Sequence, residues 1–302
     1  MANLREIKKR ISSVSTTRQI TRTMEMVATA KINQALSREK RSEPYRKAIT
    51  DVMLTVAGDA SDEFHSPLLA NPEHYERALL IGINSDRGLA GGFNVQVERA
   101  MEKRIDHYRR HGAQEVELIT CGRKVSDYFH GYPNVVMSVA GESADPTFRR
   151  AKMIADYARD GFAEGRFGRV DIVYFHAKNR VEQVLRAERI LPLDISLVHV
   201  ARGPRTDKKG PQRLSSPFEY HPSAEQVLNE LIPTYVLTVV HQALIDSAAA
   251  EQGARRKSMH SATENANDII SALNRTYNRV RQGSITTEIN EIVGGAAALE
   301  DN

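Results

Sequence analysis

The stretch MANLREIKKRISSVSTTRQITRTMEMVATAKI (residues 1–32) begins a long helical pattern that decides how the chain is built. Its apolar residues recur at spacings of three and four, first at Leu4, Ile7, Ile11 and Val14. From Leu4 to Val56 there is no glycine, and Pro44 is the only proline, so we expect one helix over residues 1–58. Such a helix would span roughly 80 Å at 1.5 Å per residue. Because isolated helices are marginal in water, it must bury its apolar stripe against a partner.

A second helical pattern covers residues 223–302. It starts near Ser223, and its apolar stripe includes Leu228, Leu231, Tyr235, Val239, Ile269, Leu273, Ile289 and Ile292. Gly294 suits the C-terminal cap of this helix. The two terminal helices therefore predict a long antiparallel coiled coil, provided that the middle of the chain folds back between them.

The two terminal segments carry opposite charge, although the net charge of the chain is only +4. Residues 1–58 hold 12 Lys and Arg against 5 Asp and Glu, whereas residues 223–302 hold 6 against 10. Opposite charges on neighbouring helices favour their pairing. A basic N-terminal segment would also suit a scaffold that binds nucleic acid, but the acidic C-terminal segment opposes that alternative, so we expect no nucleic-acid partner.

The middle of the chain has a different hydrophobic pattern. Residues 59–76 hold turn formers and predict a linker, and 201–222 predict a polar loop. Between them, buried strands are expected at 78–83, 116–121, 135–140 and 170–175, helices at roughly 93–110, 122–130 and 147–163, and a further strand or hairpin at 181–193. Alternating strands and helices predict a Rossmann-like α/β domain over 77–200 with a largely parallel sheet.

The glycine-rich segment SDRGLAGGFN (85–94) raises the possibility of a nucleotide site. Its glycines, at positions 88, 91 and 92, match neither the dinucleotide fingerprint nor the P-loop, and Phe93 stands where a P-loop has lysine. Asp86 would also repel an incoming phosphate. We therefore expect a turn between a strand and a helix, in which Gly91 or Gly92 allows tight packing.

No other residues predict chemistry. His107 and His111 are four residues apart but have no acidic or cysteine partner nearby for a metal, and Cys121, the only cysteine, is expected to be a buried core residue. The segment VLTVVHQALI (236–245) is too short and too polar to span a membrane. The first 20 residues are similar to a mitochondrial transit peptide, but the helical pattern continues past them without a break. We expect a bacterial protein without catalytic, metal-binding or cofactor-binding residues.

Three segments carry a specific resemblance to a known family. Residues 1–32 resemble the N-terminal helix of the gamma subunit of the rotary ATP synthase, SDRGLAGGFN resembles that family's central loop, and YNRVRQGSITTEINEIVGGAAAL (277–299) resembles its C-terminal signature. The resemblance spans essentially the whole chain. It implies a non-catalytic rotor that couples proton flow to ATP synthesis or hydrolysis and regulates ATPase activity, with residues 1–58 and 223–302 as its shaft.

The resemblance also implies partners and contact residues. The partners are the alternating ring of alpha and beta subunits, the epsilon subunit and the ring of c subunits. Membrane contact is indirect, at the cytoplasmic face of the bacterial membrane, and ATP, ADP and magnesium are bound by alpha and beta. The positions that match coupling or contact residues of the family are Met24, Arg255, Arg281, Gln282, Thr286, Glu288 and Glu291.

The sequence departs from the family pattern at two positions that bear on this interpretation. Ala90 stands where the loop commonly has cysteine, and Gly283 stands where alanine is usual. A glycine inside a helix costs on the order of 1 kcal/mol, so the upper shaft could be locally softer. The alternative function is a nucleotide-dependent enzyme with a coiled-coil appendage, which the mismatched glycine pattern and the missing acid–base pair oppose.

Overall fold

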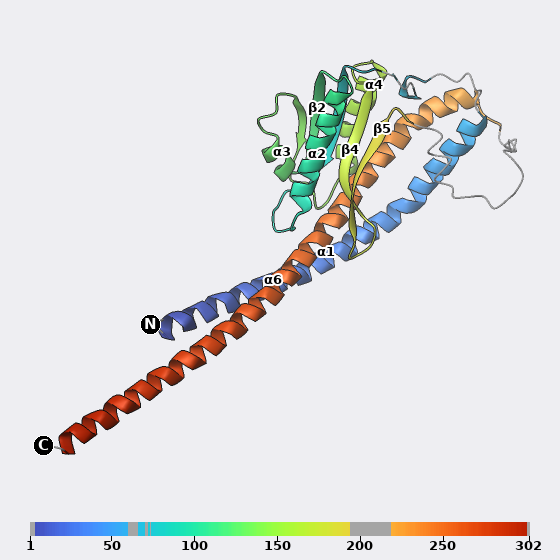
Figure 1. Cartoon of the computed structure of the whole chain (residues 1–302). Helices are drawn as coiled ribbons and strands as arrows, with labels where there is room; N and C mark the ends of the chain where they lie inside the picture. Colours follow the sequence, from blue (N-terminus) through green and yellow to red (C-terminus); the bar gives the residue numbers. More distant parts are fainter. Residues whose placement is uncertain (1–3, 60–65, 70–71, 73, 194–218, 301–302) are drawn as a thin grey trace, which may run out of the picture. The chain divides into compact units, whose positions relative to one another are not determined.

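A computed structural model describes residues 4–59, 66–69, 72, 74–193 and 219–300. The chain divides into two compact units. The first, which we call the helical pair, consists of residues 1–28 and 255–302, and the second, which we call the central unit, consists of residues 29–254. Two long helices contribute to both units: α1 (Leu4–Asp59) and α6 (Ala224–Glu300) (Figure 1).

The helices α1 and α6 run antiparallel within each unit (Figure 1). In the helical pair, Arg18 bonds to Asn267 and Thr21 bonds to Thr263. The residue number rises along α1 while that of its partner on α6 falls, as expected of antiparallel helices. In the central unit, Ser42 of α1 bonds to Gln242 of α6 in the same sense. Two long terminal helices and a central sheet confirm the predicted fold class.

The central unit is built on a five-stranded sheet in the order β3-β2-β1-β4-β5. The strands are β1 (Arg77–Ile83), β2 (Glu115–Cys121), β3 (Val135–Val139), β4 (Arg169–Ala177) and β5 (Gln183–Leu191). Strands β1 to β4 are parallel, and β5 pairs antiparallel with β4 at one edge. The expected strands at 78–83, 116–121, 135–140 and 170–175 are thus present, and the segment 181–193 contributes the antiparallel strand.

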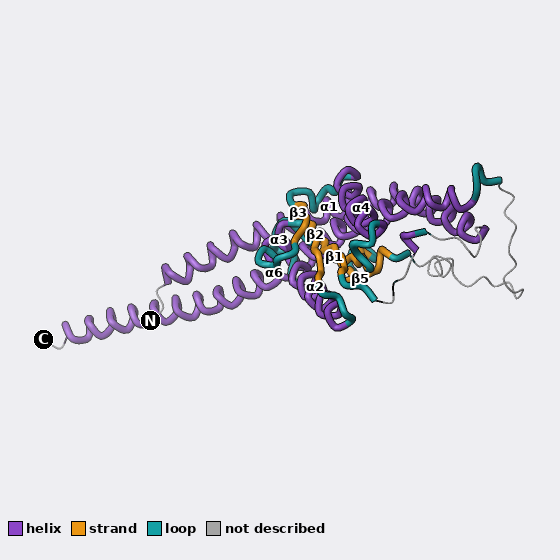
Figure 2. Tube along the Cα trace, turned by 90° about the horizontal axis from the view of Figure 1, so that it is seen from above, coloured by secondary structure: helices purple, strands orange, loops and turns teal. Residues whose placement is uncertain are grey.

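Helices cover both faces of the sheet. The helices α2 (Phe93–Arg110) and α3 (Arg123–Tyr128) pack on one face, while α4 (Phe148–Ala163) and the first part of α6 pack on the other. Figure 2 shows α2 and α4 on opposite sides of the strands. Alternate residues of β1 enter the two cores. Leu79 and Ile81 lie in the core that α4 covers, and Ala78 and Leu80 lie in the core that α2 covers. Burial on both faces explains why the parallel strands read as continuous apolar runs.

The two ends of the long helix α6 can be compared with the predicted start near Ser223 and the predicted cap at Gly294. Its first turn follows Ser223, whose Oγ accepts a hydrogen bond from the Gln226 backbone N–H at 3.3 Å, as expected of a helix cap. The expected C-terminal cap at Gly294 is wrong, because α6 continues to Glu300. The linker 59–76 contains the short 3₁₀ helix η1 (Pro67–Leu69), and most of the predicted loop 201–222 lies outside the described residues.

Candidate functional site

The seam of the helical pair is lined by few buried side chains, of mixed size and polarity. Its buried residues are Ile7, Thr21 and Ala28 from α1 and Arg255, Met259 and Ala266 from α6. Polar contacts fix the register: Thr21 Oγ1 and Thr263 Oγ1 lie 2.8 Å apart, and His260 Nδ1 lies 3.0 Å from Glu25 Oε1. Small residues let two helices approach closely, and the bonded pairs hold one against the other.

The seven positions inherited from the family resemblance fall into two groups in the helical pair. Met24 is half-buried and Arg255 is buried. The remaining five are exposed on the C-terminal part of α6: Arg281, Gln282, Thr286, Glu288 and Glu291. Thr286 Oγ1 donates to the Gln282 carbonyl at 3.0 Å, within the helix itself. No described part of the chain covers these five side chains.

The C-terminal end of α6 has no α1 residue opposite it. Thr263 faces Thr21, and the described part of α1 begins 17 residues before Thr21, at Leu4, which corresponds to Val280 on α6. Beyond that point the apolar residues are exposed: Ile285, Ile289, Ile292 and Val293. The expectation that Ile289 and Ile292 continue a stripe buried against the first helix is therefore wrong. Exposed apolar side chains of this size indicate an interaction surface.

Gly283 lies inside this exposed part of α6, where an added Cβ would meet nothing within 4 Å. Gly283→Ala is therefore expected to stabilise the helix locally by about 1 kcal/mol and to slow amide hydrogen exchange around it about fivefold. Hydrogen exchange of the full chain measures this. Gly131→Ala, which is equally open but lies outside α6, serves as the control. Unchanged exchange around residue 283 would show that glycine does not soften this part of the helix.

The glycine-rich loop is held by its own aspartate. Asp86 Oδ1 accepts hydrogen bonds from the backbone N–H groups of Arg123 at 2.9 Å and Gly141 at 2.8 Å, and Asp86 Oδ2 accepts one from Ser143 at 2.9 Å. Burial alone would raise the pKa of Asp86, but these backbone hydrogen bonds outweigh it and hold the pKa below its usual value. The carboxylate thus ties together the loops after β1, β2 and β3.

Close backbone packing occurs at a glycine that the sequence analysis did not single out. Gly122, directly after β2, has φ +107°, and a Cβ there would lie 2.4 Å from the Asn84 carbonyl oxygen. By contrast, a Cβ at Gly92 would meet the flexible end of Gln96 at 3.0 Å. Close approach of backbone to backbone thus occurs at Gly122, whereas Gly92 approaches a side chain and Gly91 adopts a positive φ of 58°.

The side chains considered for chemistry have structural roles. Cys121 is buried, and burial raises its pKa to about 12, which leaves it unreactive. His111 Nδ1 lies 2.7 Å from the carbonyl oxygen of His107, one helical turn earlier. Within the described residues no group of three His, Cys, Asp or Glu side chains could hold a metal, and no helix is long and apolar enough to cross a membrane.

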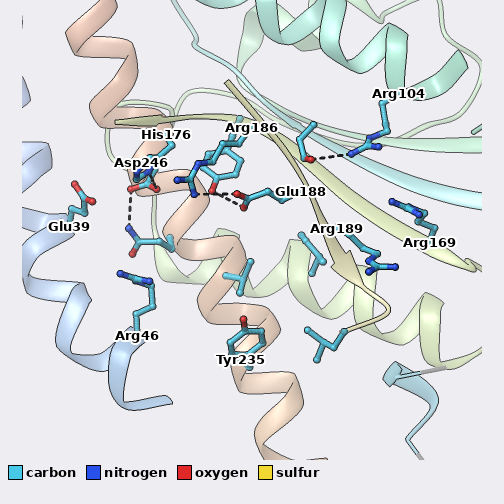
Figure 3. A pocket seen from close by; sticks show the side chains of 16 residues that line it. Glu39, Arg46, Arg104, Arg169, His176, Arg186, Glu188, Arg189, Tyr235 and Asp246 are labelled. Carbon is cyan, nitrogen blue, oxygen red and sulfur yellow. Dashed lines mark hydrogen bonds and ion pairs between the residues drawn. The ribbon is translucent and has the colours of Figure 1, made fainter. Parts of the chain in front are cut away.

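A charged cavity of about 860 Å³ beside β5 was not predicted (Figure 3). It is lined by residues of α1, α2, β4, β5 and α6, among them Arg46, Arg104, Arg169, Arg186, Arg189 and His176. On one side, His176 Nδ1 lies 2.7 Å from Asp246 Oδ2, and burial raises the pKa of Asp246. On the other side, Arg104 and Arg169 bond to the fully buried Asp171. The charge of Asp171 within the apolar run VDIVYF was the one signal that could have indicated this cluster.

Known proteins share this sequence pattern and this architecture. A family sequence model described as ATP synthase matches residues 3–299. Chains from two assemblies of the Euglena gracilis mitochondrial ATP synthase are similar in structure. The first, from rotational state 3, has a TM-score of 0.66 at 17% identity, covering 98% of this chain and 94% of that chain. The second, from a rotor, has a TM-score of 0.60 at 16% identity, covering 93% and 98%. A chain from the central stalk and c-ring of the Tetrahymena thermophila enzyme has a TM-score of 0.56 at 22% identity, covering 80% and 99%.

Proposed function

The chain belongs to the gamma-subunit family of ATP synthase, and from this premise we propose that it is the rotor of the central stalk, turning inside a ring of alpha and beta subunits. Rotation would couple transmembrane proton flow to ATP synthesis or hydrolysis at the beta subunits. The proposal includes contacts with the epsilon subunit and the c-subunit ring, and a peripheral position at the cytoplasmic face of a bacterial membrane.

One observation carries the mechanism. The helical pair has a fixed antiparallel register, yet its far end exposes apolar and charged side chains that no described residue of this chain covers. A ring of three beta subunits would meet a different side of this asymmetric pair at each position. Each beta subunit would then be biased toward a different nucleotide state by differential contact energy.

We also assign roles to the seven positions that match coupling or contact residues of the family. Met24 and Arg255 would transmit force to the moving part of the beta subunit. The five exposed positions Arg281, Gln282, Thr286, Glu288 and Glu291 would contact beta near the end of the shaft. The proposal also places nucleotide and magnesium on alpha and beta rather than on this chain.

Assembly tests the proposed function directly. When an affinity-tagged chain is purified from its host membranes, we expect alpha, beta and epsilon to accompany it, with one copy of this chain per three beta subunits. A chain that purifies without these subunits would contradict the rotor assignment. Saturable micromolar binding of nucleotide to the isolated chain, in the absence of such subunits, would favour the enzyme alternative.

Met24→Lys is expected to lower the number of protons pumped per ATP hydrolysed severalfold while the complex still assembles. A charge at this half-buried position would disturb the surface through which force passes, but would leave most of the helical pair intact. Reconstituted complexes measure proton pumping and ATP hydrolysis side by side. Met153→Lys introduces the same change at an exposed methionine of α4 and serves as the control. Unchanged pumping per ATP in Met24→Lys would reject the role given to Met24.

A further inference from the structure

A chain of hydrogen bonds joins the sheet of the central unit to both long helices. His176 lies near the end of β4, and its Nδ1 lies 2.7 Å from Asp246 Oδ2 on α6. The other carboxylate oxygen, Oδ1, accepts a hydrogen bond from Gln242 Nε2 at 2.9 Å, one turn earlier on α6. Gln242 Oε1 in turn accepts a hydrogen bond from Ser42 Oγ of α1 at 3.2 Å. Asp246 thus holds β4 directly and reaches α1 through Gln242.

Asp246 is the centre of this chain of bonds and is almost fully covered. Its side chain is 4% exposed, whereas that of His176 is 22% exposed and lines the charged cavity (Figure 3). Burial raises the pKa of Asp246, and the hydrogen bonds from His176 and Gln242 act in the opposite direction. A carboxylate at this depth costs free energy that an apolar side chain would not. Its two bonds therefore bear on geometry more than on net stability.

Asp246 lies where the apolar contacts of α6 change from one core to the other. Leu244 belongs to the core that α4 covers, and Ala249 belongs to the core that α2 covers. Apolar contacts are non-directional, so small alanine side chains specify the rotation of a helix only loosely. A hydrogen bond requires a defined distance and angle. The bonds of Asp246 therefore fix the rotation of α6 at a place where packing specifies it least.

Neighbouring charged groups act on Asp246 but are not part of the chain of bonds. Burial, and then the charge of Asp246, raises the pKa of Glu39 on α1, because the two carboxylates repel each other. Arg186 of β5 attracts Asp246 but bonds to Glu188 on its own strand at 3.2 Å. The link to α1 is the weaker half of the chain of bonds, because the single hydroxyl proton of Ser42 also has the Glu39 carbonyl within reach, at 2.9 Å. The bond between β4 and α6 is therefore its firm part.

We propose that Asp246 is a positioning residue of the rotor, which fixes the rotation of α6, and through it that of α1, relative to the sheet. A turning force on the sheet then passes into both long helices instead of being lost by movement where they contact the sheet. This inference rests on the proposed rotor function and adds the residue at which the sheet is locked to the helices. The seven positions that match coupling or contact residues of the family all lie in the helical pair, outside this joint.

The angle of a bead attached to the central unit of the assembled complex measures the joint. The complex is fixed to a surface through its beta subunits, and the bead is attached at Lys152→Cys, an exposed position of α4. At each pause, the variance of the bead angle is inversely proportional to the torsional stiffness between the bead and the ring. Asp246→Leu keeps roughly the shape of the side chain but accepts neither hydrogen bond, so the variance is expected to rise about twofold. Asp246→Asn keeps one accepting oxygen and should give an intermediate variance.

Asp171→Asn is the matched control, because it separates a loss of stability from a loss of position. It removes another buried charge of the central unit, whose partners Arg104 and Arg169 lie on α2 and β4 rather than on α6. The variance of the bead angle is expected to stay at that of the unchanged complex. An equal rise in Asp171→Asn and Asp246→Leu, or no rise in Asp246→Leu, would overturn the proposal.

Gln242→Met gives a second test if Asp246→Leu does not assemble. Gln242 is half-buried, and methionine has a similar length but makes neither the bond to Asp246 nor the bond to Ser42. The variance should rise in this variant as well, and an unchanged variance would count against the role of Asp246. Failure of the rotor function itself looks different, because the bead on the unchanged complex would then not turn when ATP is added.

Discussion

Asp171→Asn is expected to lower the free energy of unfolding of the central unit by about 3 kcal/mol. The asparagine keeps the shape of the side chain but removes the charge that Arg104 and Arg169 bond to in a fully buried position. Both guanidinium groups then lose their counter-charge while they remain largely covered. Urea unfolding followed by tyrosine fluorescence measures the change, since nine of the ten tyrosines lie in the central unit and the chain has no tryptophan.

Asp145→Asn is the matched control for this prediction. Asp145 also pairs with an arginine, Arg38, at 2.9 Å, but its side chain is 75% exposed. Losing an exposed ion pair is expected to cost less than about 1 kcal/mol. If the two variants were destabilised equally, burial of Asp171 would not be what makes its charge necessary.

The elements of the central unit could be predicted because their burial leaves a direct trace in the sequence. A strand covered on both faces is apolar along its length, as in β1. A helix covered on one face repeats its apolar residues every three or four positions, as in α2, whose bounds match the expected 93–110. The antiparallel pairing of the terminal helices followed from stripe length and opposite charge. The end of α6 did not follow, because Gly294 suits a cap but does not impose one.

The candidate site was less predictable, for two physical reasons. Positions such as Arg281 and Glu288 are exposed in the described part of the chain, so only the resemblance pointed to them. The ion pairs of the buried Asp171 join it to Arg104 of α2 and Arg169 of β4, and the packing of a helix on a strand is not visible in the sequence of either element alone. Sequence reasoning found the glycine-rich loop but did not show that the carboxylate of Asp86 in this loop accepts hydrogen bonds from the loops after β2 and β3.

The need for glycine at position 122 was also not visible in the sequence, and it leads to the second prediction of a large loss of stability. Gly122→Ala is expected to lower the free energy of unfolding of the central unit by about 4 kcal/mol. Its φ of +107° is strained for any residue with a side chain, and the added Cβ would lie 2.4 Å from the Asn84 carbonyl oxygen and 2.7 Å from the Asn84 carbonyl carbon. Backbone atoms of Asn84 cannot move aside easily, because the Asn84 N–H bonds to the Cys121 carbonyl at 2.7 Å.

Two further variants separate backbone strain from the steric clash. Gly141→Ala has a comparable φ of +90° but open space around the Cβ, so it should cost only about 1–2 kcal/mol from strain. Gly131→Ala has open space and no positive φ, and should change stability little. Urea unfolding of the three variants is therefore expected to rank Gly122→Ala as the least stable and Gly131→Ala as the most stable. If Gly122→Ala lowered the free energy of unfolding no more than Gly141→Ala, close approach to Asn84 would not be the reason that the position after β2 requires glycine.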